Sequence, residues 1–384
     1  MSRTELGVQQ TRVVLTGYFL GLGVVMAVWG ARMPAVQHTA HLTTGRLSLV
    51  LLAAALGMVA GLQTGGRLAA RPARLPLLMV CGSVALAAAL ALLGQCHSLA
   101  SLLAAALVFG AAHGVLDVAV NTAAVRCQNM AGRPIMSRLH AAYSIGALGG
   151  AALAAATAGT AHSRLFLATG ATLAAMTLLT APRTLVMSGT DQSWAGVNHE
   201  PGLARSASGK VWLLGALAAA ALLGEGAAAD WAAVHVHTLH AGTAVAASAF
   251  ALYSTGMAIG RLTGDRLTTR FGAPTVVRTG AVLAAAALAT GVQCSSVPVA
   301  LAGWAVFGLG LSTTVPCLIT AAGRRGPRAV ATVSVTGYLG LLTGPALIGA
   351  LASATTLATA LLLPALLAAA LAVLAHRALE TTTP

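Results

Sequence analysis

The chain has 384 residues, of which 57% are hydrophobic and only 8% are charged, a composition too apolar for a water-soluble domain. Its formal net charge of +14 does not indicate a nucleic-acid-binding protein, because the Lys and Arg residues are spread between apolar segments and form no basic patch. The composition instead predicts a membrane-embedded protein, with no nucleic-acid partner and with anionic lipids of the cytoplasmic leaflet as partners of its basic residues.

Twelve apolar segments follow one another along the chain, and each is long enough to cross the hydrocarbon core of a bilayer as an α-helix. The one long polar stretch, residues 182–209, separates the first six segments from the last six. The sequence therefore predicts an all-α membrane protein with an amino-terminal six-helix bundle (1–181), a central cytoplasmic linker (182–209) and a carboxy-terminal six-helix bundle (210–384). The predicted spans are residues 12–31, 46–66, 75–95, 99–124, 139–160, 163–181, 211–231, 243–264, 274–293, 297–321, 330–352 and 355–375.

The basic residues are divided very unevenly between the two sides of the predicted membrane protein. All but three of the 22 Lys and Arg residues fall at the chain ends or in the loops after even-numbered spans. Since loops rich in Lys and Arg stay in the cytoplasm, this bias predicts a multi-pass plasma-membrane protein with both termini cytoplasmic. We expect it to act as a monomer. The three exceptions are Arg32, Arg46 and Arg164.

Trp29 and Arg32 close the first predicted span and are candidate substrate-binding residues. The planar guanidinium of Arg32 could hold an anionic or hydroxylated solute through paired hydrogen bonds. Alternatively, its long side chain could extend to the outer lipid headgroups. Both interpretations remain open at this point.

The same motif occurs at the ends of the second and the eighth predicted spans. The first copy, LGMVAGLQTGGRLAAR, ends at Arg71, and the second copy, TGMAIGRLTGDRLTTR, ends at Arg270. A duplicated motif at equivalent positions predicts two halves of the same topology, related by a parallel pseudo-two-fold repeat. Each copy has glycines four residues apart on one helix face, which favours close helix packing or a surface on which helices slide.

The fourth predicted span carries three polar residues at four-residue spacing, His113, Asp117 and Asn121, which therefore share one helix face. Counting about 1.5 Å per residue from Arg126 places Asp117 near the middle of the bilayer. Ionisable residues at this depth are costly and usually line a functional cavity. We therefore predict Asp117 as a proton-coupling residue and His113 and Asn121 as substrate-binding residues. The alternative is that Asp117 and Asn121 only hydrogen-bond a neighbouring span.

Two further polar residues lie at the beginning of the fifth predicted span, where His140 precedes Tyr143. The imidazole of His140 could line a central cavity or cap the helix, and the sequence favours neither interpretation. Both residues are therefore candidates for substrate binding.

The seventh predicted span contains two carboxylates, Glu225 and Asp230. Counting from the start of the span places Glu225 inside the bilayer and Asp230 near the outer surface, beside Trp231. Glu225 is therefore the second predicted proton-coupling residue. Asp230 and Trp231 are candidates for substrate binding, or they belong to the membrane interface, where aromatic residues are common.

Three histidines near the end of this segment, His235, His237 and His240, have a spacing that metal ligands can have. Because no fixed fourth ligand accompanies them, we expect a solvated outer loop and no metal site. The sequence also shows no nucleophile with a base beside it, as an enzyme would need. We therefore predict neither an enzyme activity nor a bound cofactor.

The chain resembles the rhizopine-transport-like subgroup of the major facilitator superfamily, which is related to the fucose:proton symporters. The segments GVLDVAVNTAAV and GRPIMSRLHAAYSIGALGGA are similar to its fourth and fifth spans, and GEGAAADWAAVHV to its seventh. GLGLSTTVPCLITAAGR and GYLGLLTGPALIGALA are similar to its tenth and eleventh spans. The resemblance implies the major facilitator fold, two six-helix bundles around a midplane cavity that opens to each side in turn. It also implies proton coupling, with Asp117 and Asn121 at one signature position and Glu225 and Asp230 at another.

The segment GRLTGDRLTTRFG resembles the cytoplasmic signature of the superfamily. The resemblance implies that Asp265, with Arg266 and Arg270, forms a charge relay that latches the cytoplasmic side shut. In the first copy of the repeat Gly66 stands where the second copy has Asp265, so we expect the first latch to be weakened or absent. The predicted gate residues are Asp265, Arg266, Arg270, Arg67 and Arg71.

The function that these residues favour is secondary active transport of a small solute, coupled to protons, with a sugar or an inositol derivative as the favoured solute. A second hypothesis is export of hydrophobic or cationic compounds by proton antiport, because the segments are rich in alanine and poor in hydrogen-bond donors. A third is a non-transporting membrane sensor on the same fold. The predicted partners are therefore the solute, protons and the lipid bilayer.

Overall fold

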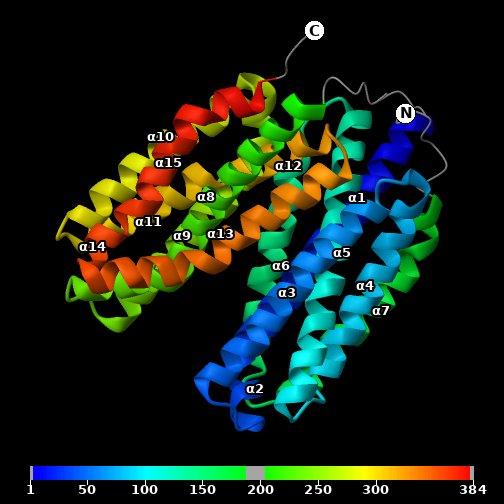
Figure 1. Cartoon of the computed structure of the whole chain (residues 1–384), viewed down its shortest axis with the longest axis horizontal. Helices are drawn as coiled ribbons and strands as arrows, with labels where there is room; N and C mark the ends of the chain where they lie inside the picture. Colours follow the sequence, from blue (N-terminus) through cyan, green and yellow to red (C-terminus); the bar gives the residue numbers. More distant parts are fainter. Residues whose placement is uncertain (1–2, 187–203, 381–384) are drawn as a thin grey trace. The chain divides into compact units, whose positions relative to one another are not determined.

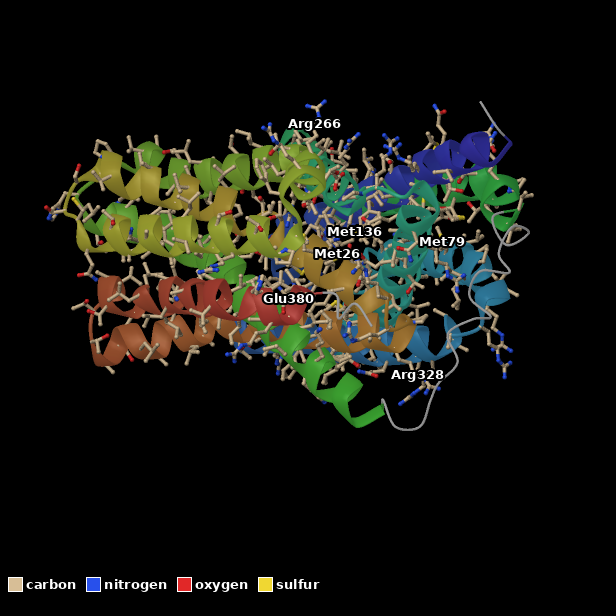
Figure 2. All side chains as sticks on the ribbon, turned by 90° about the horizontal axis from the view of Figure 1, so that it is seen from above. Met26, Met79, Met136, Arg266, Arg328 and Glu380 are labelled. Carbon is tan, nitrogen blue, oxygen red and sulfur yellow. The ribbon has the colours of Figure 1, made fainter. Side chains whose placement is uncertain are left out.

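The structure is a computed structural model that describes residues 3–186 and 204–380 and consists of α-helices joined by short connections (Figure 1). Most side chains that point outward from the helices are hydrocarbon, as expected of surfaces that contact lipid (Figure 2). Among the described residues, 11 helical stretches are long and apolar enough to cross a membrane. The predicted all-α membrane fold is therefore confirmed.

One more span, the eighth in chain order, is α9 (Thr243–Phe271). It has the length of a membrane helix but is less apolar than the others. Four charged residues lie in its second half, and they account for the difference. They lie among and after the last glycines of the repeated motif, on a helix that continues unbroken to Phe271. The four are Arg261, Asp265, Arg266 and Arg270.

The described helices form two compact units, and the first unit holds the first six spans together with Arg325–Ala331 from late in the chain. The ring of Trp29 lies in its core, 5.1 Å from the ring of Phe109 and 6.2 Å from that of Phe166. Its elements are α1 (Arg3–Ala31), α2 (Met33–Thr39), α3 (Thr44–Leu68), the 3-10 turn η1 (Pro72–Arg74), α4 (Leu75–Leu93), α5 (Leu99–Ala131), α6 (Met136–Ala156) from Leu139 onward, and α7 (His162–Val186).

The second unit holds the last six spans together with Arg133–Arg138 from the first half of the chain. Its core contains Phe307, whose ring lies 5.9 Å from the rings of both Trp304 and Tyr253. Its elements are α8 (Ala204–Thr238), α9, α10 (Ala273–Gln293), α11 (Val297–Leu311), α12 (Thr314–Gly323), α13 (Pro327–Ala354) from Thr332 onward, α14 (Leu357–Ala360) and α15 (Leu362–Leu379).

Helices extend into both ends of the predicted linker, residues 182–209, because α7 continues to Val186 and α8 already begins at Ala204. Residues 187–203 lie outside the described part of the chain. Pro182 lies inside α7 and does not end that helix.

Glycines of the repeated motif allow two pairs of helices to pack with their backbones in contact. A Cβ atom on Gly61 of α3 would lie 2.1 Å from the carbonyl oxygen of Ala111 in α5. A Cβ atom on Gly256 of α9 would likewise lie 2.1 Å from the carbonyl oxygen of Ala305 in α11. Since no side chain fits at these positions, the glycines are required for close packing between the second and fourth spans of each unit.

We expect Gly61→Ala to destabilise the protein, because the added methyl group meets helix backbone and not a flexible side chain. Overpacking of this kind typically costs about 1–3 kcal/mol. The thermal unfolding midpoint of the detergent-solubilised protein measures the effect. Gly45→Ala in the same helix is the matched control, because a Cβ atom there meets nothing within 4 Å. Equal midpoints for the two variants would contradict the close packing of α3 on α5.

Candidate functional site

The polar face of α5 is the first part of the candidate site. The helix begins at a capping box between Ser98 and Ser101 and ends at Gly132, which is in the left-handed conformation. Within this long helix His113 and Asn121 are buried, while Asp117 is partly exposed. The predicted common face is therefore retained, with a carboxylate at its centre.

The side chain of Asn121 orients Asp117 within the helix. Its Nδ2 donates to the Asp117 backbone oxygen at 2.9 Å and to the Asp117 carboxylate at 3.2 Å. The Oδ1 atom of Asn121 is buried and has no hydrogen-bond partner among the described residues. The Asn121 amide thus holds the carboxylate from its own helix and keeps one acceptor for another group.

An ion pair inside the second unit is the second part of the candidate site. Glu225 of α8 lies 3.7 Å from the guanidinium of Arg261 in α9, with side-chain exposures of 33% and 8%. The buried hydroxyl of Tyr253, also in α9, has no hydrogen-bond partner among the described residues. Arg261 lies ten residues before the end of α9, or about 15 Å along its axis, so the pair is well inside the spanning segment.

Sequence reasoning missed Arg261, because it counted this arginine among the cytoplasmic loop charges. The signal was present in the repeated motif. Arg261 directly follows Gly260, which belongs to the glycine face of a helix, so its side chain had to lie inside the span. A buried arginine needs hydrogen-bond acceptors or an opposite charge, and Glu225 is the carboxylate that the structure brings to Arg261.

Trp231 and Asp230 follow Glu225 on α8 and have different surroundings. The Trp231 Nε1 donates to the backbone oxygen of Pro345 in α13 at 3.2 Å, and the indole also packs against Gly349. Proline at 345 cannot disturb this bond, because its carbonyl remains an acceptor. Asp230 is exposed. The structure therefore gives Trp231 a role in joining α8 to α13, and it leaves the binding role of Asp230 as a prediction.

Arg32 is buried and binds the end of α6, an arrangement that neither sequence interpretation considered. Its guanidinium donates to the backbone oxygen of Thr157, to the Thr157 hydroxyl at 3.0 Å and to the backbone oxygen of Ala158 at 3.2 Å. These carbonyls follow the last turn of α6, where a helix leaves acceptors unsatisfied and where a cation is favourable. We therefore assign Arg32 to the capping of α6 and not to solute binding.

His140 and Tyr143 lie on α6. The imidazole of His140 packs against Phe19 of α1, with ring centroids 5.3 Å apart. The backbone oxygen of Tyr143 would lie 2.0 Å from a Cβ atom on Gly23, so α1 and α6 are closely packed here. Since α6 begins at Met136, His140 lies in its second turn and is too far along the helix to cap its start.

The start of α6 is capped by Asp265 of α9, which is 2% exposed. Its carboxylate accepts from the backbone N–H groups of Ser137 at 3.0 Å and of Arg138 at 3.2 Å, and it lies 3.3 Å from the Arg138 Nε. A carboxylate at a helix amino terminus is stabilised by free N–H groups and by the helix dipole. Asp265 therefore binds both a helix end and a cation.

Arg138 is the ion-pair partner of Asp265 among the described residues, and the sequence had predicted Arg266 and Arg270. Residues one and five positions along a helix from Asp265 do not face it, which explains the difference. Arg266 is exposed, and its side chain points away from the helices (Figure 2). The guanidinium of Arg270 lies over the ring of Phe271, 5.2 Å from its centroid.

The first copy of the repeat packs without a carboxylate. A Cβ atom on Gly66 would lie 2.5 Å from the Ala331 Cβ and 3.2 Å from the backbone oxygen of Pro327, at the start of α13. The space that a side chain would need is thus filled by another helix. Arg67 and Arg71, the other predicted gate residues of this copy, are exposed.

We expect Asp265→Asn to lower the apparent free energy of unfolding by about 2 kcal/mol, because the bonds to the α6 start lose their charge assistance. Thermal unfolding of the purified protein measures the change. Arg266→Gln is the control, since the exposed Arg266 should contribute little. A midpoint for Asp265→Asn equal to that of the control would contradict the capping role.

His235 corrects the prediction of a solvated outer loop. It is buried, and its Nδ1 lies 3.4 Å from the Nε1 of Trp304, whose indole packs edge-on against the imidazole. The loop prediction failed because α8 continues to Thr238 and carries His235 into the core. Within residues 3–186 and 204–380, no three His, Cys, Asp or Glu side chains are grouped so that they could hold a metal ion.

Comparison with known sequences shows three relatives of similar length, although no family model matches the chain. It is 32% identical to an uncharacterized MFS-type transporter of Yersinia pestis, over 92% of this chain and 91% of the relative. It is 33% identical to an uncharacterized transporter of Sinorhizobium fredii, over 95% of this chain and 97% of the relative. It is 27% identical to the membrane protein MosC of Rhizobium meliloti, over 94% and 88% of the two chains.

Comparison with solved structures shows the same fold in two symporters. The Escherichia coli fucose:proton symporter FucP has a TM-score of 0.76 and 16% identity, over 96% of this chain and 98% of the symporter. The proton:xylose symporter XylE has a TM-score of 0.76 and 13% identity, over 99% and 97% of the two chains. At these identities the likeness shows the fold, with twelve helices in two six-helix bundles.

Proposed function

Because the chain belongs to the major facilitator superfamily of transporters, we propose that it moves a small polar solute across the plasma membrane by alternating access, driven by protons. The observation that carries the proposal is the ion pair between Glu225 and Arg261 within the spanning helices. Charges at this depth are costly and usually serve a function. Both termini are proposed to lie in the cytoplasm.

The proton-coupling step that we propose begins at Glu225. When a proton neutralises its carboxylate, the nearly buried Arg261 loses the attraction of that charge. Because weakening a largely buried ion pair is unfavourable, α8 and α9 then favour another arrangement. The proton thereby changes the relative free energies of the conformations, which is the coupling that an accumulating transporter needs.

Asp117 is proposed as the second proton carrier and as part of the solute site. Its carboxylate already accepts from Asn121, while the Asn121 Oδ1 has no partner among the described residues. A solute hydroxyl can donate to this oxygen and accept from other groups, which suits a polyhydroxylated molecule. The solved structures with this fold include a fucose and a xylose symporter, and they support a sugar or inositol-like solute as the proposed class.

Transport in proteoliposomes tests the proposal. Purified protein is reconstituted, and counterflow of labelled sugars and inositols is measured together with uptake driven by a pH gradient or by a sodium gradient. We expect counterflow of at least one polyhydroxylated solute and accumulation in response to the pH gradient. Accumulation driven only by sodium would contradict proton coupling. Efflux of cationic or hydrophobic dyes without sugar exchange would favour the exporter hypothesis instead.

A further inference from the structure

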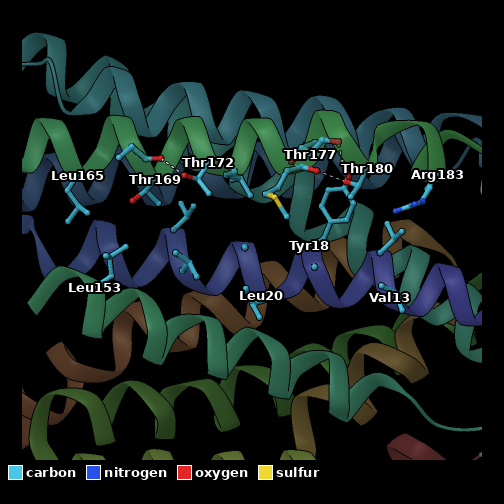
Figure 3. Close-up of a pocket in the computed structure, with 18 of the residues that line it drawn as sticks. Val13, Tyr18, Leu20, Leu153, Leu165, Thr169, Thr172, Thr177, Thr180 and Arg183 are labelled. Atoms are coloured by element: carbon cyan, nitrogen blue, oxygen red, sulfur yellow. Dashed lines mark hydrogen bonds between the residues drawn. The ribbon is translucent and has the colours of Figure 1, made fainter. Parts of the chain in front are cut away.

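A long groove with a volume of about 1150 Å³ lies within the first unit, between α1, the end of α6 and α7 (Figure 3). Arg164 and Arg183 line it near opposite ends of α7. They are 19 positions apart, about 28 Å along the helix, which is close to the thickness of a bilayer hydrocarbon core of about 30 Å. The groove is therefore about as long as the hydrocarbon core is thick and has a cation near each end.

The interior of the groove offers little to a polar solute. The hydroxyls of Thr172 and Thr180 donate to backbone oxygens of their own helix, each at 2.8 Å. The Thr177 hydroxyl is bonded to that of Ser83 at 2.8 Å. Because these groups are already satisfied, most of the remaining lining between the two ends is hydrocarbon, which favours an occupant with acyl chains.

One hydroxyl in the groove is an exception. Thr169 is only 7% exposed, and its Oγ1 has no hydrogen-bond partner among the described residues. Figure 3 shows its side chain between α7 and α1. It lies five positions from Arg164, about 7.5 Å along α7. A ligand with a charged group at Arg164 and a carbonyl about five bonds deeper, as in a glycerophospholipid, would satisfy this buried donor.

The groove end at Arg164 is positive, with no acidic residue in the surrounding sequence. From Asp117 to Asp191 the chain contains no other Asp or Glu. Arg164 is exposed, and the nearby Arg32 binds Thr157, which also lines the groove. Uncompensated cations of this kind favour an anionic group, and arginine is well suited to phosphate.

We propose that the groove binds an anionic phospholipid from the leaflet opposite the amino terminus. Its phosphate lies against Arg164, an ester carbonyl accepts from the Thr169 hydroxyl, and its acyl chains extend between α1 and α7. The Arg183 end is not part of this site, because the neighbouring Thr180 hydroxyl is already bonded and leaves no buried donor. The site does not depend on which solute the protein carries.

Native mass spectrometry of the purified protein tests this site. Phosphatidylglycerol is titrated, and the tightest lipid adduct is compared with that formed with phosphatidylcholine. We expect Arg164→Ala to weaken the phosphatidylglycerol adduct about tenfold and Thr169→Val about threefold to tenfold. Ala168→Trp, which places an indole into the groove at an exposed position, should abolish it. Arg46→Ala is the matched control, because Arg46 is exposed and does not line the groove.

Two outcomes would overturn the proposal. Equal affinity for phosphatidylcholine and phosphatidylglycerol would exclude an anionic site. An unchanged adduct in Arg164→Ala, with elution and circular dichroism like those of the parent protein, would place the lipid elsewhere. Because the experiment measures the mass of the protein with its bound lipid, neither outcome depends on transport activity.

Discussion

Glu225→Gln is expected to lower the thermal unfolding midpoint of the protein and to abolish solute accumulation. The variant removes the carboxylate that lies 3.7 Å from Arg261, while the nearly buried guanidinium keeps its charge. Removing one partner of a buried pair costs about 3–5 kcal/mol. Since Glu225 is one-third exposed and water can partly replace it, we expect a loss of about 2–3 kcal/mol.

A double variant separates stability from coupling. In Glu225→Gln with Arg261→Met both charges are gone, so the unfolding midpoint should recover toward that of the parent protein. Accumulation should remain absent, because no carboxylate is left at this position to carry the proton. A single variant as stable as its parent would contradict the stabilising pair. Accumulation by the double variant would remove Glu225 from the proposed mechanism.

Asp117→Asn is expected to abolish accumulation driven by a pH gradient while solute exchange continues. Asparagine has almost the same shape and keeps an oxygen that can accept from Asn121, but it cannot carry a proton at physiological pH. We expect at least a tenfold loss of gradient-driven uptake in proteoliposomes and little change in counterflow. Glu380→Gln is the control, because Glu380 is an exposed carboxylate that follows the last helix, α15, and belongs to no part of the proposed site.

Either of two results would contradict this role of Asp117. Unchanged pH-driven accumulation in the variant would show that the proton travels elsewhere. Loss of counterflow together with accumulation would show that Asp117 is needed for solute binding or folding and not for coupling alone.

Much of the fold could be predicted from the sequence, because each span must satisfy its backbone within one helix and remain apolar toward lipid. The duplicated glycine motif also predicted close packing, and its glycines do meet helix backbone at Ala111 and Ala305. The loop predicted at His235 was wrong, because a histidine near the end of an apolar segment was taken as the end of the span. The helix α8 in fact continues past it to Thr238.

The site was less predictable, because ion pairs between helices depend on how the helices face one another. The face of Asp117 and Asn121 follows from spacing within one helix and is found in the structure. The partners of Glu225 and Asp265 lie on other helices. Local spacing therefore could not match Arg261 to Glu225 or Arg138 to Asp265. The groove beside α7 was also unpredictable, since it depends on side-chain packing across three helices.

Each compact unit contains a short piece from the other half of the chain, and this has a consequence for biosynthesis. The first unit includes Arg325–Ala331, and Ala331 lies against Gly66. A ribosome makes this piece more than 250 residues after it has made Gly66. The first unit therefore cannot mature while the rest of the chain is still being translated, and a gene cut between the halves would yield a fragment in which Gly66 stays uncovered.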